Sequence, residues 1–164
     1  MRTLIIKFLQ SVLIFLLILT FSNESLAGIG RQKSDPDSAI RKSLYRLNEM
    51  CATKDVQKMM SLFDDSEDII VVGSDSGEVF IGKKQVQSFM SFLCKMPFVF
   101  SFDLNMVSIN HNKNTAWVFV DGKMVHTKGN IITARIPYRI TAVMVKRGSD
   151  WKWKIFSGSI PRGE

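Results

Sequence analysis

The apolar residues of this chain follow a helical period before Pro97 and a strand period after it. Three early segments carry apolar side chains three and four residues apart, which predicts helices with one buried face. The first begins with Asp35 as N-cap and Pro36 in the first turn. The face residues are Ile40, Leu44, Leu47 and Cys51 in the first helix, Val56, Met59, Met60 and Phe63 in the second, and Val86, Phe89, Met90 and Leu93 in the third. Short strands are predicted between the last two helices, at residues 69–72 and 79–81.

Four longer segments follow, at residues 98–106, 115–125, 132–144 and 151–155. In three of them apolar and polar residues alternate, whereas the segment 115–125 is apolar on both faces. Turn residues separate the segments at 112–114, 128–130 and 147–150, so they predict an antiparallel meander with one apolar face. Helices first and long strands later indicate the α+β class, with the helices covering the sheet.

The front of the chain has the pattern of an export signal. Residues 12–19 are all apolar, Arg2 and Lys7 precede them, and the small residues Ser25 and Ala27 mark a cleavage site. We therefore expect a signal peptide at 1–27, a polar tether at 28–34 and one domain at 35–161, in a periplasmic or secreted protein. The alternative is an uncleaved membrane anchor, and only then would the protein associate with a membrane.

The net charge of +7 is spread along the chain and does not cluster. An exported protein with diffuse charge is not expected to bind nucleic acid. A solvated basic surface is the simplest explanation, and attraction to an anionic envelope surface or an acidic protein is the alternative.

Several short motifs, in their order, resemble the nuclear transport factor 2-like superfamily and its SnoaL-like branch. They are Asp35-Pro36, Lys54-Asp55-Val56, Phe63-Asp64-Asp65, the strand 69–73, the segment 77–82, Ala116-Trp117-Val118 and Trp153-Lys154-Ile155 with Ser159 and Pro161. The resemblance implies a cone-shaped domain in which a curved antiparallel sheet wraps around three N-terminal helices and leaves an apolar pocket. It also implies a homodimer through the outer face of the sheet, where Arg135 and Arg139 would need acidic partners across the interface, or else a dimer that forms differently.

Two residues are candidates for catalysis in that pocket. Asp121 shares strand parity with Trp117 and Phe119, and a carboxylate in an apolar pocket can act as a general base. Tyr138 lies on the inward parity of its strand and could donate a hydrogen bond to a ligand oxygen. The alternatives are that Asp121-Gly122 forms a bend or bulge and that Tyr138 is a core residue.

The last strand offers weaker chemistry. Its alternation places Trp151, Trp153 and Ile155 inward and continues to Ser157 and Ser159 at the pocket mouth. Many SnoaL-like relatives carry histidine or other titratable groups near this segment. A serine without a neighbouring base is a poor catalyst, so the departure from the family pattern weakens the case for an enzyme.

The remaining titratable residues suggest no further site. His111 and His126 are expected at the surface. The acidic run from Asp64 to Asp68 lacks the spacing of a calcium loop and is expected to be a solvated loop at the end of a helix. No metal-ligand or cofactor motif occurs, so neither a metal nor a cofactor is expected. Cys51 and Cys94 either form a disulfide or remain two buried thiols.

The sequence therefore favours a non-catalytic binding module for a small hydrophobic ligand or peptide. The expected ligand-binding residues are Phe63, Trp117, Phe119, Tyr138, Ser157 and Ser159. An envelope assembly or interaction domain is one alternative. A SnoaL-like isomerase or lyase that uses Asp121 and Tyr138 is the other.

Overall fold

The computed structural model describes residues 35–162, which form one compact unit. The predicted signal peptide and tether lie outside these residues. The elements are α2 (Pro36–Thr53), α3 (Val56–Met60), β1 (Ile70–Val72), β2 (Val79–Ile81), α4 (Lys83–Lys95), β3 (Val99–His111), β4 (Thr115–Lys128), β5 (Ile131–Arg147) and β6 (Asp150–Ser159). Their order confirms the α+β class. Among these residues no helix combines the length and the apolar character needed to span a membrane.

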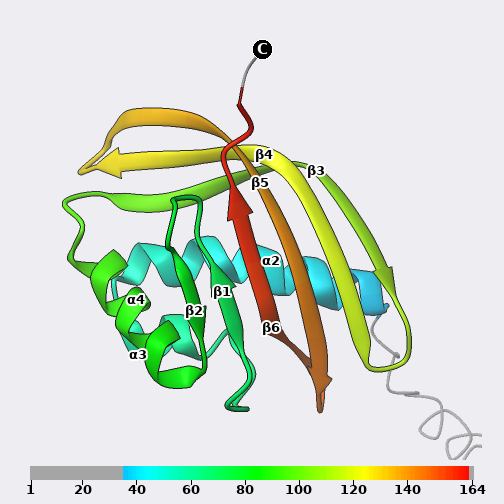
Figure 1. Cartoon of the computed structure of the whole chain (residues 1–164). Helices are drawn as coiled ribbons and strands as arrows, with labels where there is room; N and C mark the ends of the chain where they lie inside the picture. The colour runs from blue at the N-terminus through cyan, green and yellow to red at the C-terminus, as the bar shows by residue number, and fades with distance from the viewer. Residues whose placement is uncertain (1–34, 163–164) are drawn as a thin grey trace, which may run out of the picture. The chain divides into compact units, whose positions relative to one another are not determined.

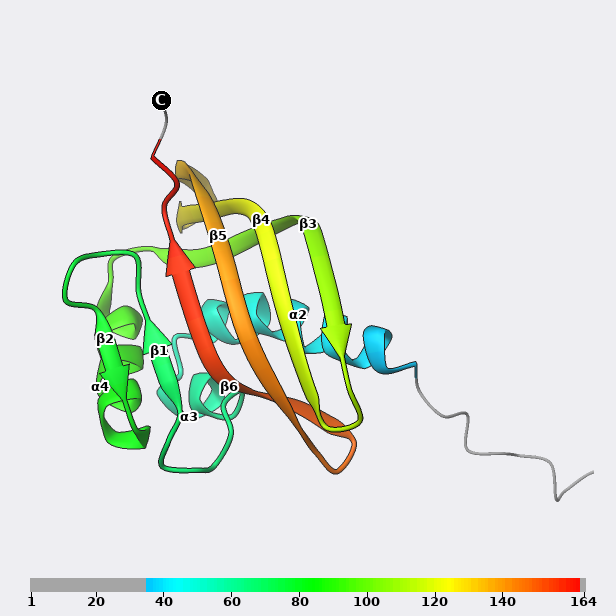
Figure 2. The same ribbon diagram turned by 45° about the vertical axis from the view of Figure 1, so that its right-hand side comes forward.

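One six-stranded sheet runs in the order β2-β1-β6-β5-β4-β3. Strands β3 to β6 form the predicted antiparallel meander. The sheet as a whole is mixed, because β1 pairs antiparallel with β2 but parallel with β6. The curved sheet has the helices on one of its faces, with α2 crossing behind the long strands and α4 behind β2 (Figure 1, Figure 2).

Local capping explains where the first two helices begin and end. The Asp35 side chain accepts a hydrogen bond from the backbone N–H of Asp37 at 3.2 Å. Lys54 takes a left-handed conformation that ends α2. The Asp55 side chain then caps α3 by accepting from the backbone of Gln57 and Lys58. The predicted break between the two helices is thereby confirmed.

The core lies between the helices and the inner face of the sheet. Ile40 and Leu44 of α2 and Trp153 of β6 are almost fully buried. On β5 the buried residues are Tyr138, Ile140, Ala142 and Met144, as the alternation predicts.

A β-bulge in β6 reverses the expected orientation of the end of that strand. Trp153 lies opposite Met144, but Ile155 lies opposite Val143, so Lys154 is an extra residue. Beyond Lys154 the even-numbered residues face the helices. The predicted inward positions of Ile155, Ser157 and Ser159 are therefore wrong, and these residues face outward.

The predicted orientation of β4 is also wrong. Trp117, Phe119 and Asp121 lie on the outer face, and Trp117 is 49% exposed. The buried residues of this part of the strand are Ala116, Val118 and Val120. Because both residue sets are mainly apolar, alternation alone could not decide which one faces the helices.

A second bulge lies in β3, where two residues between Asp103 and Met106 oppose Gly122 alone. The bulge turns Val107 and Ile109 toward the core and leaves Met106 exposed. The alternative expectation of a bend or bulge at Asp121-Gly122 is close to this geometry, although the extra residue belongs to the neighbouring strand.

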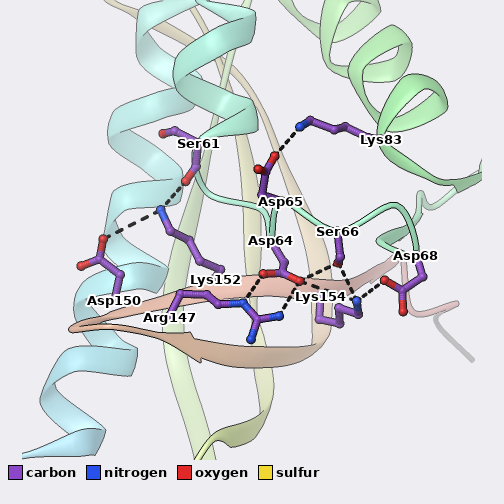
Figure 3. Close-up of polar contacts among 10 residues, drawn as sticks. All are labelled: Ser61, Asp64, Asp65, Ser66, Asp68, Lys83, Arg147, Asp150, Lys152 and Lys154. Carbon is purple, nitrogen blue, oxygen red and sulfur yellow. Dashed lines mark hydrogen bonds and ion pairs between the residues drawn. The ribbon is translucent and has the colours of Figure 1, made fainter.

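A buried carboxylate fastens the α3–β1 loop to the β5–β6 hairpin (Figure 3). Asp64 is only 3% exposed, and its two oxygens accept from Arg147 Nε at 2.6 Å and Nη2 at 2.9 Å. Ser66 Oγ donates to Asp64 Oδ2 at 2.6 Å, and Lys154 Nζ lies 3.6 Å from the same oxygen. The Arg147 hydrogen bonds hold the pKa of Asp64 well below its usual range. The expectation that this acidic run is wholly solvated is wrong for Asp64.

Replacing Asp64 by Asn should lower the free energy of unfolding at pH 7 by about 1.5–3 kcal/mol, because charged hydrogen bonds are lost. The low folded-state pKa stabilises the protein fully above the unfolded value of about 3.9, and this contribution is lost as the pH falls through the folded value. Urea denaturation should therefore show a smaller difference in the free energy of unfolding between the wild type and Asp64→Asn at pH 3 than at pH 7.

The matched control is Asp65→Asn, which removes an exposed carboxylate that pairs with Lys83. It should leave the urea midpoint nearly unchanged. Equal stability of the wild type and Asp64→Asn at pH 7 would contradict the structural role of Asp64.

Candidate ligand-binding site

A cavity of about 310 Å³ lies between the helices and the inner face of the sheet. Phe92 and Ile160 line it and are partly exposed, so they mark a side that is open to solvent. Most of the wall is aromatic or apolar, as in sites for small organic ligands. Its phenylalanines are Phe63, Phe89, Phe92, Phe98, Phe100, Phe102 and Phe156.

The polar part of the wall comes from the β1–β2 turn and from two strands. Ser74, Asp75 and Glu78 belong to the turn, Tyr138 to β5 and His126 to β4. No lysine or arginine is among the described lining residues. The formal charge of the cavity wall is therefore negative, although the chain as a whole is positive.

Tyr138 is 6% exposed and lines the cavity, on the side of the sheet that its alternation predicts. A Cβ on Gly158 would lie 1.9 Å from the Tyr138 hydroxyl, so only glycine leaves room for it. Burial raises the pKa of Tyr138 to about 12, and the charges of Glu78 and Asp75 add to this rise, whereas a hydrogen bond with Ser74 opposes it. The hydroxyl is therefore neutral at physiological pH.

Glu78 is held over the backbone of the same turn. Its Oε2 atom accepts from the backbone N–H of Asp75 at 3.0 Å. A Cβ on Gly73 would lie 2.0 Å from Oε2, so the absence of a side chain there makes space for the carboxylate. Gly73 also donates its N–H to the Glu78 carbonyl at 2.8 Å. The turn thus fixes the carboxylate at the edge of the cavity.

His126 lies in the cavity wall, which corrects the expectation that it is exposed. Its ring stacks on Phe98 with centroids 4.3 Å apart and meets the edge of Phe100 at 5.1 Å. Its Nε2 atom is buried without a hydrogen-bond partner. Burial lowers the pKa of His126, so the neutral imidazole is favoured at physiological pH. His111 is at the surface, as expected.

Of the residues expected to bind a ligand, the structure brings Phe63 and Tyr138 together in the cavity wall. Trp117, Phe119, Ser157 and Ser159 face outward and do not line it. Asp121 also faces outward, and its Oδ1 atom accepts from Arg139 Nε at 3.2 Å. It therefore cannot reach a ligand in the cavity.

Sequence reasoning missed His126 and Glu78. His126 has the same even parity as Val118, Val120 and Met124, so a correct orientation of β4 would have placed it inward. Glu78 lies in a turn, where alternation gives no orientation. Its position depends on the parallel pairing of β1 with β6, which connects segments far apart in the sequence.

The sulfur and metal chemistry of the described residues is limited. Cys51 and Cys94 are free thiols, and burial raises the pKa of Cys51 to about 12. Cys94 Sγ lies 3.4 Å from Met59 Sδ. Within residues 35–162, no three histidine, cysteine or acidic side chains are grouped as metal ligands.

The sequence profile of the SnoaL-like domain family matches residues 40–163. No curated protein sequence matches the chain. Solved structures similar to this one include a protein of the NTF2-like (nuclear transport factor 2-like) family from Streptomyces avermitilis, provisionally described as a dehydratase. Its TM-score is 0.68 at 16% identity, over 79% of this chain and 100% of that one.

Two further similar structures are NTF2-like proteins of unknown function. The one from Pseudomonas putida KT2440 has a TM-score of 0.63 at 16% identity, over 77% of this chain and 87% of that one. The one from Shewanella oneidensis MR-1 has a TM-score of 0.59 at 14% identity, over 76% and 99%. At these identities the likeness concerns the fold alone.

Proposed function

The chain belongs to the SnoaL-like domain family, and we propose that it binds a small apolar ligand without transforming it. The observation that carries this proposal is the cavity of about 310 Å³ with seven phenylalanines in its wall. A volume of this size suits a small molecule and not a folded peptide segment. Each methylene group of a ligand buried there contributes about 0.8 kcal/mol to binding.

The position of Asp121 argues against the isomerase or lyase mechanism that uses this residue as the base. Proton abstraction needs a base within hydrogen-bond reach of the substrate, and Asp121 pairs with Arg139 on the opposite face of the sheet. The similarity to a provisional dehydratase concerns the fold, which by itself does not decide a reaction. Recovery of the bound ligand unchanged is the outcome that this proposal expects.

Filling the cavity should abolish ligand binding. Met124 lines the cavity on β4, and Met124→Trp would occupy space that the ligand needs. We expect at least a tenfold loss of affinity for a neutral apolar probe, 1-decanol, measured by isothermal titration calorimetry. Overpacking should also cost about 1–3 kcal/mol of stability, so thermal unfolding is measured in parallel.

The matched control is Met106→Trp, which makes the same change on the outer face, where Met106 is exposed. It should keep the affinity of the wild type. Undiminished binding by folded Met124→Trp would show that the ligand does not use this cavity.

The outer face of the sheet supports a second proposal, a homodimer. An apolar row crosses five strands there through paired neighbours: Ile81, Ile70, Ile155, Val143 and Trp117. Ile81 and Trp117, at the two ends of the row, are about half exposed. A contiguous apolar surface of this kind favours contact with a second copy.

Charge does not oppose this contact. Arg135 Nη1 lies 3.0 Å from Asp103 Oδ2, and Arg139 Nε lies 3.2 Å from Asp121 Oδ1. The two arginines therefore already have acidic partners in their own chain. An interface on this face therefore does not require acidic partners for Arg135 and Arg139 from the second copy.

Placing a charge in the row should dissociate the dimer, because the lysine would be buried against an apolar surface. We expect Trp117→Lys to shift the sedimentation coefficient to that of a monomer at concentrations where the wild type is dimeric. Ile131→Lys is the control, since it adds the same charge at an exposed isoleucine at the start of β5. A monomeric wild type would overturn the dimer proposal.

A further inference from the structure

We propose that the ligand of the cavity is a hydrophobic amine, whose ammonium group binds between Glu78, Asp75 and Tyr138 while its apolar body lies among the phenylalanines. This inference rests on the proposed function, because it names the chemical class that the same cavity selects. Four features of the cavity wall support it.

The first feature is the sign of the charge. Asp75 and Glu78 are the acidic residues of the described cavity wall, and no basic lysine or arginine lines it. The chain nevertheless has 22 lysines and arginines against 15 acidic residues. The acidic wall thus runs opposite to the charge of the whole protein, and it favours a cationic ligand group over an anionic one.

The second feature is the fixed position of the Glu78 carboxylate. One oxygen, Oε2, accepts from the Asp75 N–H, and this contact leaves further lone pairs on the carboxylate. Gly73 provides the space in which the carboxylate lies. A carboxylate that is already held in place loses little conformational freedom when it binds a cation.

The third feature is the presence of the hydroxyl groups of Tyr138 and Ser74 in the same wall as the two carboxylates. The Tyr138 hydroxyl fits against Gly158, and Tyr138 lines the same cavity as Ser74, Asp75 and Glu78. An alkylammonium group has three N–H donors and no acceptor. Carboxylate and hydroxyl oxygens together offer the acceptors that such a group needs.

The fourth feature is the aromatic wall. Phe92 is 52% exposed at the open side and stacks on Phe89, with ring centroids 6.4 Å apart. The face of an aromatic ring attracts a cation as well as apolar groups. The phenylalanines therefore accommodate the apolar body of an amine without excluding its positive charge.

A fatty acid would fit this wall poorly. Its carboxylate would lie near Asp75 and Glu78, and the remaining titratable groups of the cavity offer it no stable positive charge. His126 stacks on Phe98 and meets Phe100 edge-on, and its burial lowers its pKa and favours the neutral imidazole. Tyr138 can donate one hydrogen bond but remains uncharged.

The experiment compares three ligands of equal chain length at pH 7.5: decylamine, 1-decanol and decanoate. Isothermal titration calorimetry on the wild type should give the tightest binding for decylamine, about tenfold tighter than 1-decanol, and the weakest for decanoate. Glu78→Gln should lose about tenfold in affinity for decylamine and keep its affinity for 1-decanol. The retained binding of 1-decanol shows that the variant is folded.

The matched control is Asp121→Asn, the same removal of one negative charge on the outer face of the sheet. It should bind all three ligands as the wild type does. The amine inference would be overturned, and the proposed function left intact, if the wild type bound decylamine and 1-decanol equally well or bound decanoate more tightly than decylamine. Failure of all three ligands to bind would overturn both.

Discussion

The extra residue at Lys154 determines which side chains of the last strand reach the cavity. Before it, Trp153 packs into the core, and after it Phe156 and Gly158 face inward. The Lys154 side chain itself turns toward the α3–β1 loop, where its Nζ donates to Ser66 Oγ at 2.7 Å and contacts Asp68. The bulged residue thus belongs to the ionic cluster around Asp64, and the residues that follow it contribute to the cavity wall.

The same bulge makes room for Tyr138 in the cavity wall. Without it, Ser157 would face Tyr138 in place of Gly158, and the tyrosine hydroxyl would have no space. The bulge also turns Ile155 outward, where it continues the apolar row between Ile70 and Val143. The inward and outward residues at the end of β6 thus depend on this bulge, which lies beside the ion pairs that Lys154 and Arg147 make with Asp64.

Much of the fold could be predicted from the sequence, because helix caps, apolar spacing and turn residues are local signals. The N-cap Asp35 and the alternation of β5 are examples, and the inward position of Tyr138 followed from that alternation. The orientation of β4 could not be predicted, because Trp117 and Val118 are both apolar and only tertiary packing selects one face. The bulge at Lys154 could not be predicted either, because an extra residue leaves no mark in the alternation of so short a strand.

In the proposed complex, the aromatic wall of the cavity binds the apolar body of the ligand, and Glu78, Asp75 and Tyr138 hold its charged end. A crystal structure of the complex with decylamine tests this arrangement most directly. We expect electron density for the alkyl chain beside Phe100 and Met124, with the nitrogen within hydrogen-bond distance of Glu78 or Tyr138. Decylamine bound on the outer face of the sheet, or with its nitrogen at the opposite end of the cavity, would contradict it.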